Sequence, residues 1–320
     1  MSPRREQEMV PRAEFRSYYG RPILKQPAWK VPDVPGYLFL GGLAGSSAML
    51  GALGGATGRP GLARASRLVA AGSAVASVGA LIHDLGRPER FLNMLRVLKP
   101  TSPLSVGSWI LAPFSGLASA SAASELTGLL PRLGTAAGAA SAGLGPAMCT
   151  YTAVLLADTA IPAWHEAHRE LPFLFAGGAL TSGAGAALIA APAAEQGPAR
   201  RIGLIGAGME LAAAYRMERG LGLVGEPYRQ GRPGKLLRAG RALTAVGAGL
   251  SVLGRRSRAV SAIAGAAYLA AGLCTRFGVF EAGKASAADP KYVVIPQRER
   301  LAGAAEPVVI EQSGAALSRP

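Results

Sequence analysis

Eight long blocks of apolar residues, separated by short charged connections, constrain this chain more than any other feature of its sequence. A helix needs about 20 apolar residues to cross the hydrocarbon core of a bilayer, and the blocks have about that length. Proline or arginine marks most of their boundaries, and proline cannot continue a helix without losing a hydrogen bond. We therefore predict an all-α, polytopic membrane bundle of about eight transmembrane helices, over residues 34–56, 67–84, 103–124, 134–157, 171–192, 200–217, 236–254 and 257–278.

The sixth and seventh of these spans carry the most charge. The sixth contains Glu210, and the seventh begins with Arg238 and Arg241. Long arginine side chains can bury their stems and reach the headgroups, so the seventh span is still able to cross. If either span failed to cross, the topology of the rest would change.

The composition excludes several other classes of protein. Only 17% of the 320 residues are charged, against about 25% in soluble domains. Together with the apolar blocks, this excludes a disordered chain, collagen, a coiled coil and a single soluble domain. We expect a polar N-terminal tail over residues 1–33, a transmembrane domain over 34–278 and a polar C-terminal tail over 279–320. The first tail has no apolar segment after its early arginines, so we do not interpret it as a signal peptide.

The spans are rich in small residues. Glycines four residues apart share one helix face, and such faces let helices approach closely in lipid. We therefore expect a tight bundle, without assigning pairs of helices. No internal repeat is visible, which argues against an inverted-repeat transporter. The pairs with this spacing include Gly41/Gly45, Gly51/Gly55 and Gly134/Gly138.

The net charge of +15 is consistent with a membrane protein and does not require a nucleic-acid partner. The basic residues lie mostly between the apolar blocks, where the positive-inside rule places them. With eight spans, 25 of the 34 Lys and Arg residues lie on the side of both termini, and 9 on the other side. We therefore expect a multi-pass protein of the cell membrane with both termini in the cytoplasm.

The cysteines and histidines predict no metal or haem held by this chain. Cys149 and Cys274 are far apart, whereas an iron–sulfur cluster needs about four thiolates. His83, His165 and His168 do not face each other across helices as a pair of haem ligands would.

A first candidate functional stretch leaves the second span at residues 83–91. Asp84 can pair with Arg87 or Arg90 and fix the loop, and His83 can transfer a proton near neutral pH. The alternative interpretation is a salt-bridged loop with only a structural role. We take His83 and Asp84 as candidate catalytic residues.

A second stretch lies at the end of the fourth span. Tyr151 and Asp158 are seven residues apart and share a helix face. A tyrosine hydroxyl can donate a hydrogen bond to a carbonyl oxygen, and a half-buried aspartate can hold a proton. We take Asp158 as a third candidate catalytic residue, and Trp164 and His165 follow shortly after. The alternative is an interfacial aromatic belt with one aspartate at a helix end.

Two more side chains complete the candidate set. Glu210 lies inside an apolar span, where a carboxylate must be protonated, paired or facing water. It is a candidate for a proton path, and the alternative is a structural pair with a neighbouring arginine. Tyr37 lies at the membrane level of Asp84 and Asp158, so three helix ends bring Tyr37, Asp84 and Tyr151 toward one rim of the bundle.

Taken together, these stretches resemble the NrfD/polysulfide-reductase family of membrane anchors. The resemblance spans roughly residues 18–190. The segments that carry it are Tyr-Tyr-Gly-Arg-Pro at 18–22, the tyrosine and glycine run at 37–45, Asp-Leu-Gly-Arg-Pro-Glu-Arg-Phe at 84–91, Lys-Pro-Thr-Ser-Pro at 99–103 with Gly-Ser-Trp at 107–109, and residues 151–165.

The resemblance implies an eight-helix subunit without haem. Such a subunit anchors an iron–sulfur electron-transfer subunit and a molybdopterin catalytic subunit, and it exchanges electrons with a quinone such as menaquinone. The family's quinone pocket lies near the end of the first helix, against the fourth helix and the second–third loop. By resemblance, Tyr151 is the quinone-contacting tyrosine. Tyr37 stands where some members have a histidine, and the motif at 18–22 is similar to formate-dehydrogenase-associated members.

The sequence therefore predicts a quinone-reactive anchor of a molybdopterin oxidoreductase. A quinone needs an apolar slot with one or two hydrogen-bond donors, and its reduction needs protons close by. We expect Tyr37, Tyr151, Trp164 and His165 to bind the quinone. Two other functions stay open at this point, a proton- or ion-conducting subunit that depends on Glu210 and a small-solute transporter.

Overall fold

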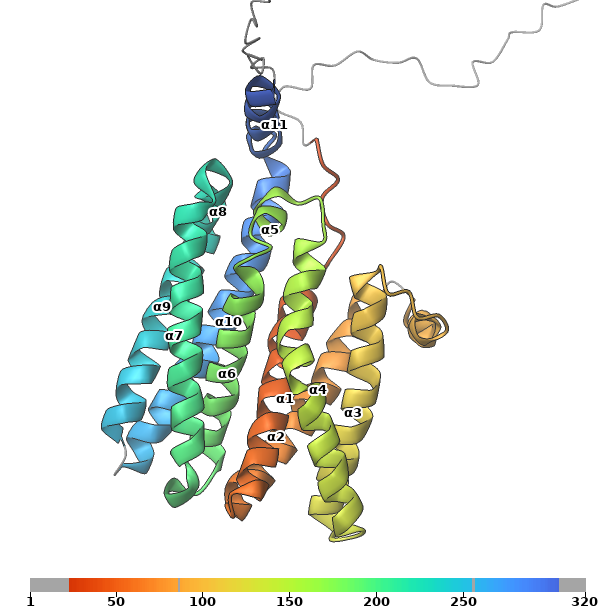
Figure 1. Ribbon diagram of the computed structural model, residues 1–320, viewed down its shortest axis with the longest axis vertical. Helices are drawn as coiled ribbons and strands as arrows, with labels where there is room; N and C mark the ends of the chain where they lie inside the picture. Colours follow the sequence, from red (N-terminus) through yellow and green to blue (C-terminus); the bar gives the residue numbers. More distant parts are fainter. Residues whose placement is uncertain (1–22, 86, 255–256, 305–320) are drawn as a thin grey trace, which may run out of the picture.

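The computed structural model describes residues 23–85, 87–254 and 257–304, and all of the regular structure in these residues is helical (Figure 1). The motif at residues 18–22 lies outside the described residues. The helices are α1 (Asp33–Ala56), α2 (Pro60–Asp84), η1 (Pro88–Leu95), α3 (Pro103–Thr127), α4 (Pro131–Ala157), α5 (Pro162–Glu166), α6 (Leu171–Ala190), η2 (Ala193–Glu195), α7 (Gly197–Gly220), η3 (Gly222–Gly225), α8 (Glu226–Arg229), α9 (Gly231–Leu253), α10 (Arg258–Ala288) and α11 (Lys291–Ala304).

Seven of the described helices are long and apolar enough to cross a membrane: α1, α2, α3, α4, α6, α9 and α10. The prediction of an all-α polytopic bundle is therefore confirmed. The remaining expected span, the sixth at residues 200–217, corresponds to α7, which has 24 residues and a length of about 36 Å. It packs along α6 and α9 as part of the same bundle. Its hydropathy is lowered by charged residues, including Glu210, which made it a weak prediction from sequence.

Several helix boundaries differ from the expected ones. α2 begins at Pro60, seven residues before the expected start, although Arg64 and Arg67 lie within its first turns. The helix tolerates Arg67 there because its guanidinium pairs with Glu125 of α3 at 2.8 Å. α10 continues to Ala288, so the expected C-terminal tail starts with ten helical residues and then contributes α11.

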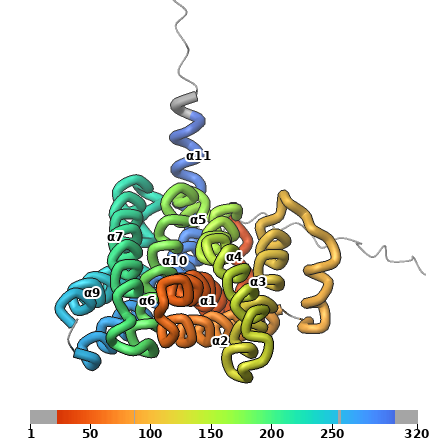
Figure 2. The backbone as a smooth tube through the Cα atoms, turned by 60° about the horizontal axis from the view of Figure 1, so that its bottom comes forward, coloured from red at the N-terminus to blue at the C-terminus, as the bar shows by residue number. Residues whose placement is uncertain are grey.

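α1 lies inside the bundle, with α2, α4, α6 and α10 packed against it (Figure 2). It is also the most enclosed of the apolar helices together with α6, because 72% of its apolar window is buried by other helices. α7 and α10 pack against α6 on one side, with α9 against α10 and α7, and α3 covers α2 and α4 on the other side. A side chain on α1 can therefore meet residues of both halves of the molecule.

Glycines allow the closest approaches between these helices. A β-carbon at Gly45 of α1 would lie 2.6 Å from the carbonyl oxygen of Gly145 on α4, and the reverse distance from position 145 is 2.8 Å. α6 makes similar reciprocal contacts with α7 and with α10. The expected tight packing of small residues is thus present. The reciprocal pairs in α6 are Gly177 with Gly206 and Gly185 with Gly265.

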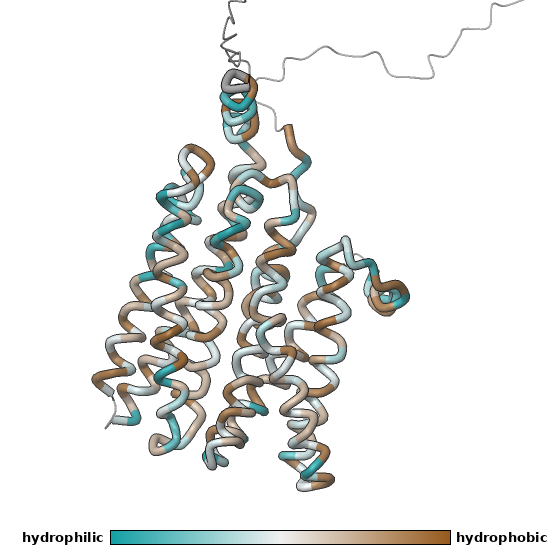
Figure 3. Tube along the Cα trace, viewed as in Figure 1, coloured by the Kyte–Doolittle hydropathy of each residue, from teal (hydrophilic) through white to brown (hydrophobic). Residues whose placement is uncertain are grey.

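The two ends of the bundle differ in what they carry. We call the end that holds α5, α8, α11 and residues 23–32 end A, and the opposite end, with the connections at 57–59, 128–130 and 191–196, end B (Figure 1). Figure 3 shows hydrophilic residues mainly toward these two ends, with hydrophobic and small residues along the helices between them.

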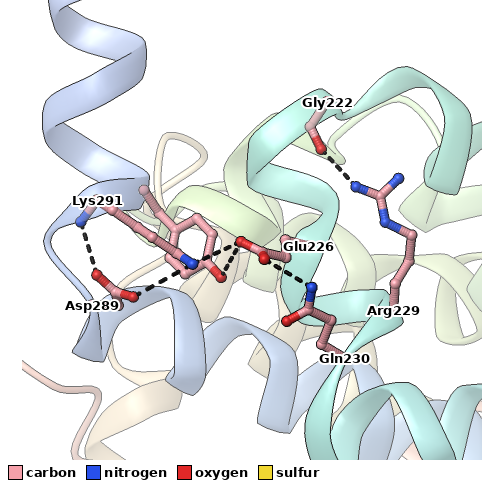
Figure 4. A network of polar contacts seen from close by, with 7 residues as sticks. Gly222, Glu226, Arg229, Gln230, Asp289 and Lys291 are labelled. Atoms are coloured by element: carbon pink, nitrogen blue, oxygen red, sulfur yellow. Dashed lines mark hydrogen bonds and ion pairs between the residues drawn. The ribbon is translucent and has the colours of Figure 1, made fainter.

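A polar network attaches α11 to end A (Figure 4). The Glu226 carboxylate pairs with the Lys291 ammonium at 2.8 Å and accepts hydrogen bonds from Tyr292 at 3.0 Å and Gln230 at 2.8 Å. The hydrogen bonds from Lys291 and Tyr292 hold the pKa of Glu226 below its usual value, and Glu226 raises the pKa of Lys291. Both groups therefore stay charged at neutral pH.

Candidate functional site

Two buried tyrosines from different helices meet near end A. The hydroxyl groups of Tyr37, in the second turn of α1, and Tyr151, in α4, form a short hydrogen bond. Their rings stand edge to face with centroids 6.3 Å apart, and the two residues are only 4% and 7% exposed. This placement is consistent with the sequence-based expectation that Tyr37 and Tyr151 lie toward one rim of the bundle.

Small residues of three helices surround the tyrosine pair. A β-carbon at Gly107 of α3 would lie 2.7 Å from the Tyr151 ring, and one at Gly41 would lie 3.9 Å from the Tyr151 hydroxyl. On α2, the buried Ser77 hydroxyl donates to the backbone carbonyl of Tyr37 at 3.4 Å. The pair is therefore held by α1, α2, α3 and α4 together, and the Tyr151 ring packs directly against α3 at Gly107.

His83 and Asp33 form a hydrogen-bonded pair one helical turn from Tyr37. His83 Nδ1 lies 2.8 Å from Asp33 Oδ2, and the imidazole is 77% exposed whereas the carboxylate is 13% exposed. Asp33 precedes Tyr37 by four residues and so shares its face of α1. The pair thus links solvent to the level of the tyrosines.

Asp84 has a different partner from the one expected. Its carboxylate accepts a hydrogen bond from the backbone N–H of Lys30 at 2.9 Å, and the Lys30 ammonium donates to the carbonyl of His83 at 3.4 Å. It does not pair with Arg87 or Arg90. The N-terminal segment, at Lys30, lies against the end of α2 in their place. Asp84 fixes that segment against the bundle.

The Asp158 carboxylate is exposed at the C-terminal end of α4. It makes no hydrogen bond or ion pair with the residues that the structure describes. Although it shares a helix face with Tyr151, it lies about 10 Å further along the axis, at the surface of end A. Its predicted proton-relay role stays a prediction.

Trp164 is enclosed in an aromatic cluster. Its ring is fully buried, stacks on Trp29 at 5.7 Å and lies 5.6 Å from Phe280, and its Nε1 donates to the carbonyl of Val279 at 2.8 Å. Gly283 of α10 makes room for it, since any β-carbon there would overlap the indole. These contacts give Trp164 a packing role that joins residues 23–32, α5 and α10.

His165 points the other way, toward the surface of end A. Its Nδ1 lies 3.1 Å from the carbonyl oxygen of Ala157, the last residue of α4. The imidazole is exposed and lines a cavity of about 460 Å³ together with Glu166, Tyr292 and Arg300. His165 therefore lies with α5 and α11, and the structure does not bring it to the tyrosine pair.

Glu210 and Arg276 form a second buried polar group, between α6, α7, α9 and α10. Both residues are 2% exposed. The Glu210 carboxylate accepts hydrogen bonds from Thr275 at 2.8 Å and Thr244 at 3.1 Å. Beside Gly178, the space for one β-carbon lies 3.1 Å from Arg276 Nη1 and 3.3 Å from Glu210 Oε1, so the two charged groups face each other there.

Arg276 is incompletely paired. Its Nη2 donates to the carbonyl of Phe175 at 2.6 Å, and its guanidinium stacks on the Phe175 ring at 3.9 Å. Its Nε and Nη1 are buried and have no hydrogen-bond partner among the described residues. Buried polar groups without partners are costly in a membrane bundle, so Arg276 is a candidate position for a bound water molecule or ligand.

A cavity of about 10 Å³, large enough for one water molecule, adjoins Glu210 and Thr275. Glu218 and Arg241 line its other side, and these two residues form an ion pair at 2.6 Å. The cavity therefore lies between the buried Glu210 carboxylate and a polar pair nearer end A.

Two functional candidates are new. Asp33 is the first, because it is the hydrogen-bond partner of His83. Arg276 is the second. Of the two arginines in the apolar run 257–278, Arg258 lies at its start, whereas Arg276 lies well inside α10, which continues to Ala288. An arginine inside such a span is itself a signal for a buried polar site.

Comparison with known families gives one match. The family described as "Polysulphide reductase, NrfD" matches residues 24–209, which is more than half of the chain. No curated protein matches the chain. The matched region contains Tyr37, His83 and Tyr151, and it ends one residue before Glu210. The tyrosine pair therefore lies within the family region, whereas Glu210 and Arg276 lie outside it.

The tyrosine hydrogen bond predicts a non-additive effect on stability. In Tyr37→Phe or Tyr151→Phe alone, one buried hydroxyl loses its partner, and we expect a loss of about 1–3 kcal/mol of unfolding free energy. In the double variant no hydroxyl stays unsatisfied, so its loss should be smaller than the sum by about 1 kcal/mol. Chemical unfolding of the purified protein in detergent measures this double-mutant cycle. Strictly additive losses would show that the two hydroxyls do not depend on each other.

Proposed function

Because the chain belongs to the polysulphide reductase NrfD family, we propose that it exchanges electrons between a partner subunit and a membrane quinone. It is a multi-pass membrane protein, and members of this family pair with oxidoreductase subunits. The observation that carries the proposal is the buried pair of tyrosine hydroxyls near end A, inside the matched region.

The tyrosine pair offers a hydrogen bond to a quinone carbonyl. Each hydroxyl carries one proton. The bond between Tyr37 and Tyr151 uses only one of the two, so the other is available to a carbonyl oxygen without loss of the pair. On the side of α3 the Tyr151 ring packs directly against the backbone at Gly107, so a quinone at the pair would lie beside α3 and not between α3 and the ring.

The Asp33–His83 pair is suited to supply or accept the protons. Conversion of a quinone to a quinol takes up two electrons and two protons, and the reverse reaction releases them. His83 is exposed to solvent, and Asp33 lies one helical turn above Tyr37. We propose that protons pass between solvent and the tyrosine pair by these two residues, with Asp84 holding the adjacent backbone in place.

The electrons come from or go to the partner in this proposal. We infer an iron–sulfur subunit seated on end A, with a molybdopterin subunit beyond it, as expected from the resemblance. Transfer to the quinone then needs no metal or haem in this chain. The exposed face formed by α5, α11 and residues 23–32 at end A, with its cavity around His165, is the surface that we assign to this contact.

We place both termini, and with them end A, on the cytoplasmic side of the cell membrane. The support for this orientation is the excess of Lys and Arg at end A, which follows the positive-inside rule.

Removal of the Tyr151 hydroxyl tests the quinone site. We expect Tyr151→Phe to lower kcat/KM for quinol in the purified complex about 10–100-fold, because a hydrogen bond that favours the transition state is lost. The complex should assemble as before. Tyr215→Phe is the matched control, since Tyr215 is 55% exposed on α7 and should leave the activity unchanged. Normal quinol kinetics in both variants would refute the proposed site.

Glu210 supports a second, related role in proton transfer. It is a buried carboxylate that shares a small cavity with the Glu218–Arg241 pair, and an incompletely paired arginine lies beside it. In our proposal this route serves protons that accompany quinone chemistry. The alternative is a subunit that conducts protons without any quinone, and it would depend on the same residue.

These two roles of Glu210 differ in what its neutral analogue does. We expect Glu210→Gln to slow quinone turnover at least about tenfold, with little change in quinone affinity. Glu125→Gln, which alters a paired carboxylate near end B, is the control. Turnover assays on the complex in liposomes measure the quinone kinetics, and a pH-sensitive dye inside the liposomes measures proton movement. Proton leakage through the chain without quinone, abolished by Glu210→Gln, would favour the alternative.

A further inference from the structure

The connection between α2 and α3 carries a short helix that lies outside the bundle. η1 has no buried residue, and in Figure 1 it is seen nearly end-on as the gold coil beside α3, whereas the long helices are seen from the side. Figure 2 shows the same segment standing apart from the other helices. η1 therefore runs across the direction of the membrane-spanning helices.

The chain places η1 at the boundary of the membrane. It follows the end of α2 at Asp84 and precedes the start of α3 at Pro103, and both helices are membrane spans. The Ser105 hydroxyl fixes the segment to α3, since it donates to the carbonyl of Val97 at 3.1 Å and accepts from the N–H of Lys99 at 3.0 Å. The segment cannot move far from this level.

The side chains of this segment combine free cations with exposed apolar groups. Four basic residues stand against the single carboxylate of Glu89, and none of the four side chains forms a hydrogen bond or ion pair with the residues that the structure describes. Leu92 is 71% exposed, Val97 71% and Leu98 53%. The four basic residues, all exposed, are Arg87, Arg90, Arg96 and Lys99.

Several other arginines of the protein are paired within the chain. Arg67 pairs with Glu125, Arg241 with Glu218 and Arg232 with Glu281. The four cations around η1, in contrast, have no side-chain partner among the described residues, and they lie beside exposed apolar side chains. An amphipathic segment in the plane of an interface, with basic and apolar residues, has the composition of a membrane-surface helix.

We propose that residues 87–99 form an in-plane membrane anchor that binds the headgroups of anionic phospholipids. Leu92, Val97 and Leu98 enter the acyl boundary, and the basic side chains hold the lipid phosphates. Each cation near an anionic leaflet contributes about a fivefold gain in affinity. This inference rests on the membrane-spanning fold alone and is independent of the quinone site.

The same cations would also suit an acidic protein surface, but the apolar residues favour lipid. A protein partner on end A would approach along the bundle axis, whereas η1 lies beside the bundle at the membrane level (Figure 1). Half-exposed Trp109, two turns into α3, is a further residue of the type found at membrane interfaces.

Amide hydrogen exchange of the full chain in nanodiscs tests this anchor. The two nanodiscs contain phosphatidylcholine alone, or phosphatidylcholine with phosphatidylglycerol. We expect exchange in residues 88–99 to be about fivefold slower or more with phosphatidylglycerol, and raised salt should reduce the difference. The triple variant Arg90→Gln/Arg96→Gln/Lys99→Gln should lose most of it.

The matched control removes three exposed cations at the other end of the bundle. Arg64→Gln/Arg132→Gln/Arg201→Gln should keep the full dependence on phosphatidylglycerol in residues 88–99. Exchange that is equal in both nanodiscs would overturn the proposal. Protection that appears only after partner subunits are added would also overturn it, because the segment would then bind an acidic protein surface.

Discussion

A polar side chain inside a membrane-spanning bundle has no bulk water to bind, so it needs a partner within the protein, and side chains too far from their own backbone must find it on another helix. This constraint selects the contacts on which the structure depends. Tyr37 and Tyr151 satisfy each other across α1 and α4. Glu210 takes hydrogen bonds from threonines of α9 and α10. Arg276 is only partly satisfied, which marks its surroundings as a place where water or a proton carrier belongs.

Close packing of small residues makes these meetings possible. α1 approaches α4 backbone to backbone at Gly45 and Gly145, eight and six residues from the tyrosines of the same helices. Gly107 lets the Tyr151 ring lie directly against α3. The segment before α1 is then fixed on end A by Trp29 in the aromatic cluster and by Lys30 on the end of α2. The site thus depends on packing that spreads over four helices.

The helical spans could be predicted because their signal is local. Length and hydropathy are properties of one segment, and they identify all of the apolar helices. The first turns of α2, residues 60–66, were not part of the expected span, which began at Arg67. In the structure Glu125 of another helix pairs with Arg67. α7 was weak for the related reason that its buried Glu210 is served by distant threonines.

The site was predictable in its tyrosines but not in their surroundings. Topology alone brings the ends of the first and fourth helices together, which suffices for Tyr37 and Tyr151. Partner choice depends on three-dimensional contacts. The sequence suggested a loop arginine as the partner of Asp84, whereas Asp84 accepts a hydrogen bond from Lys30. His83 pairs with Asp33, a partner that the sequence did not suggest. Trp164 was expected at a quinone but packs in a cluster, because Gly283 opens a space for it on α10.

Photolabelling of the complex with a photoreactive quinone analogue tests the central claim, that the quinone binds at the tyrosine pair. We predict labelled peptides that contain Tyr151 or residues 107–110 of α3, and loss of labelling in the presence of excess unlabelled quinone. Specific labelling confined to the apolar groove between α3 and α4 near end B, lined by residues 117–140, would contradict the account.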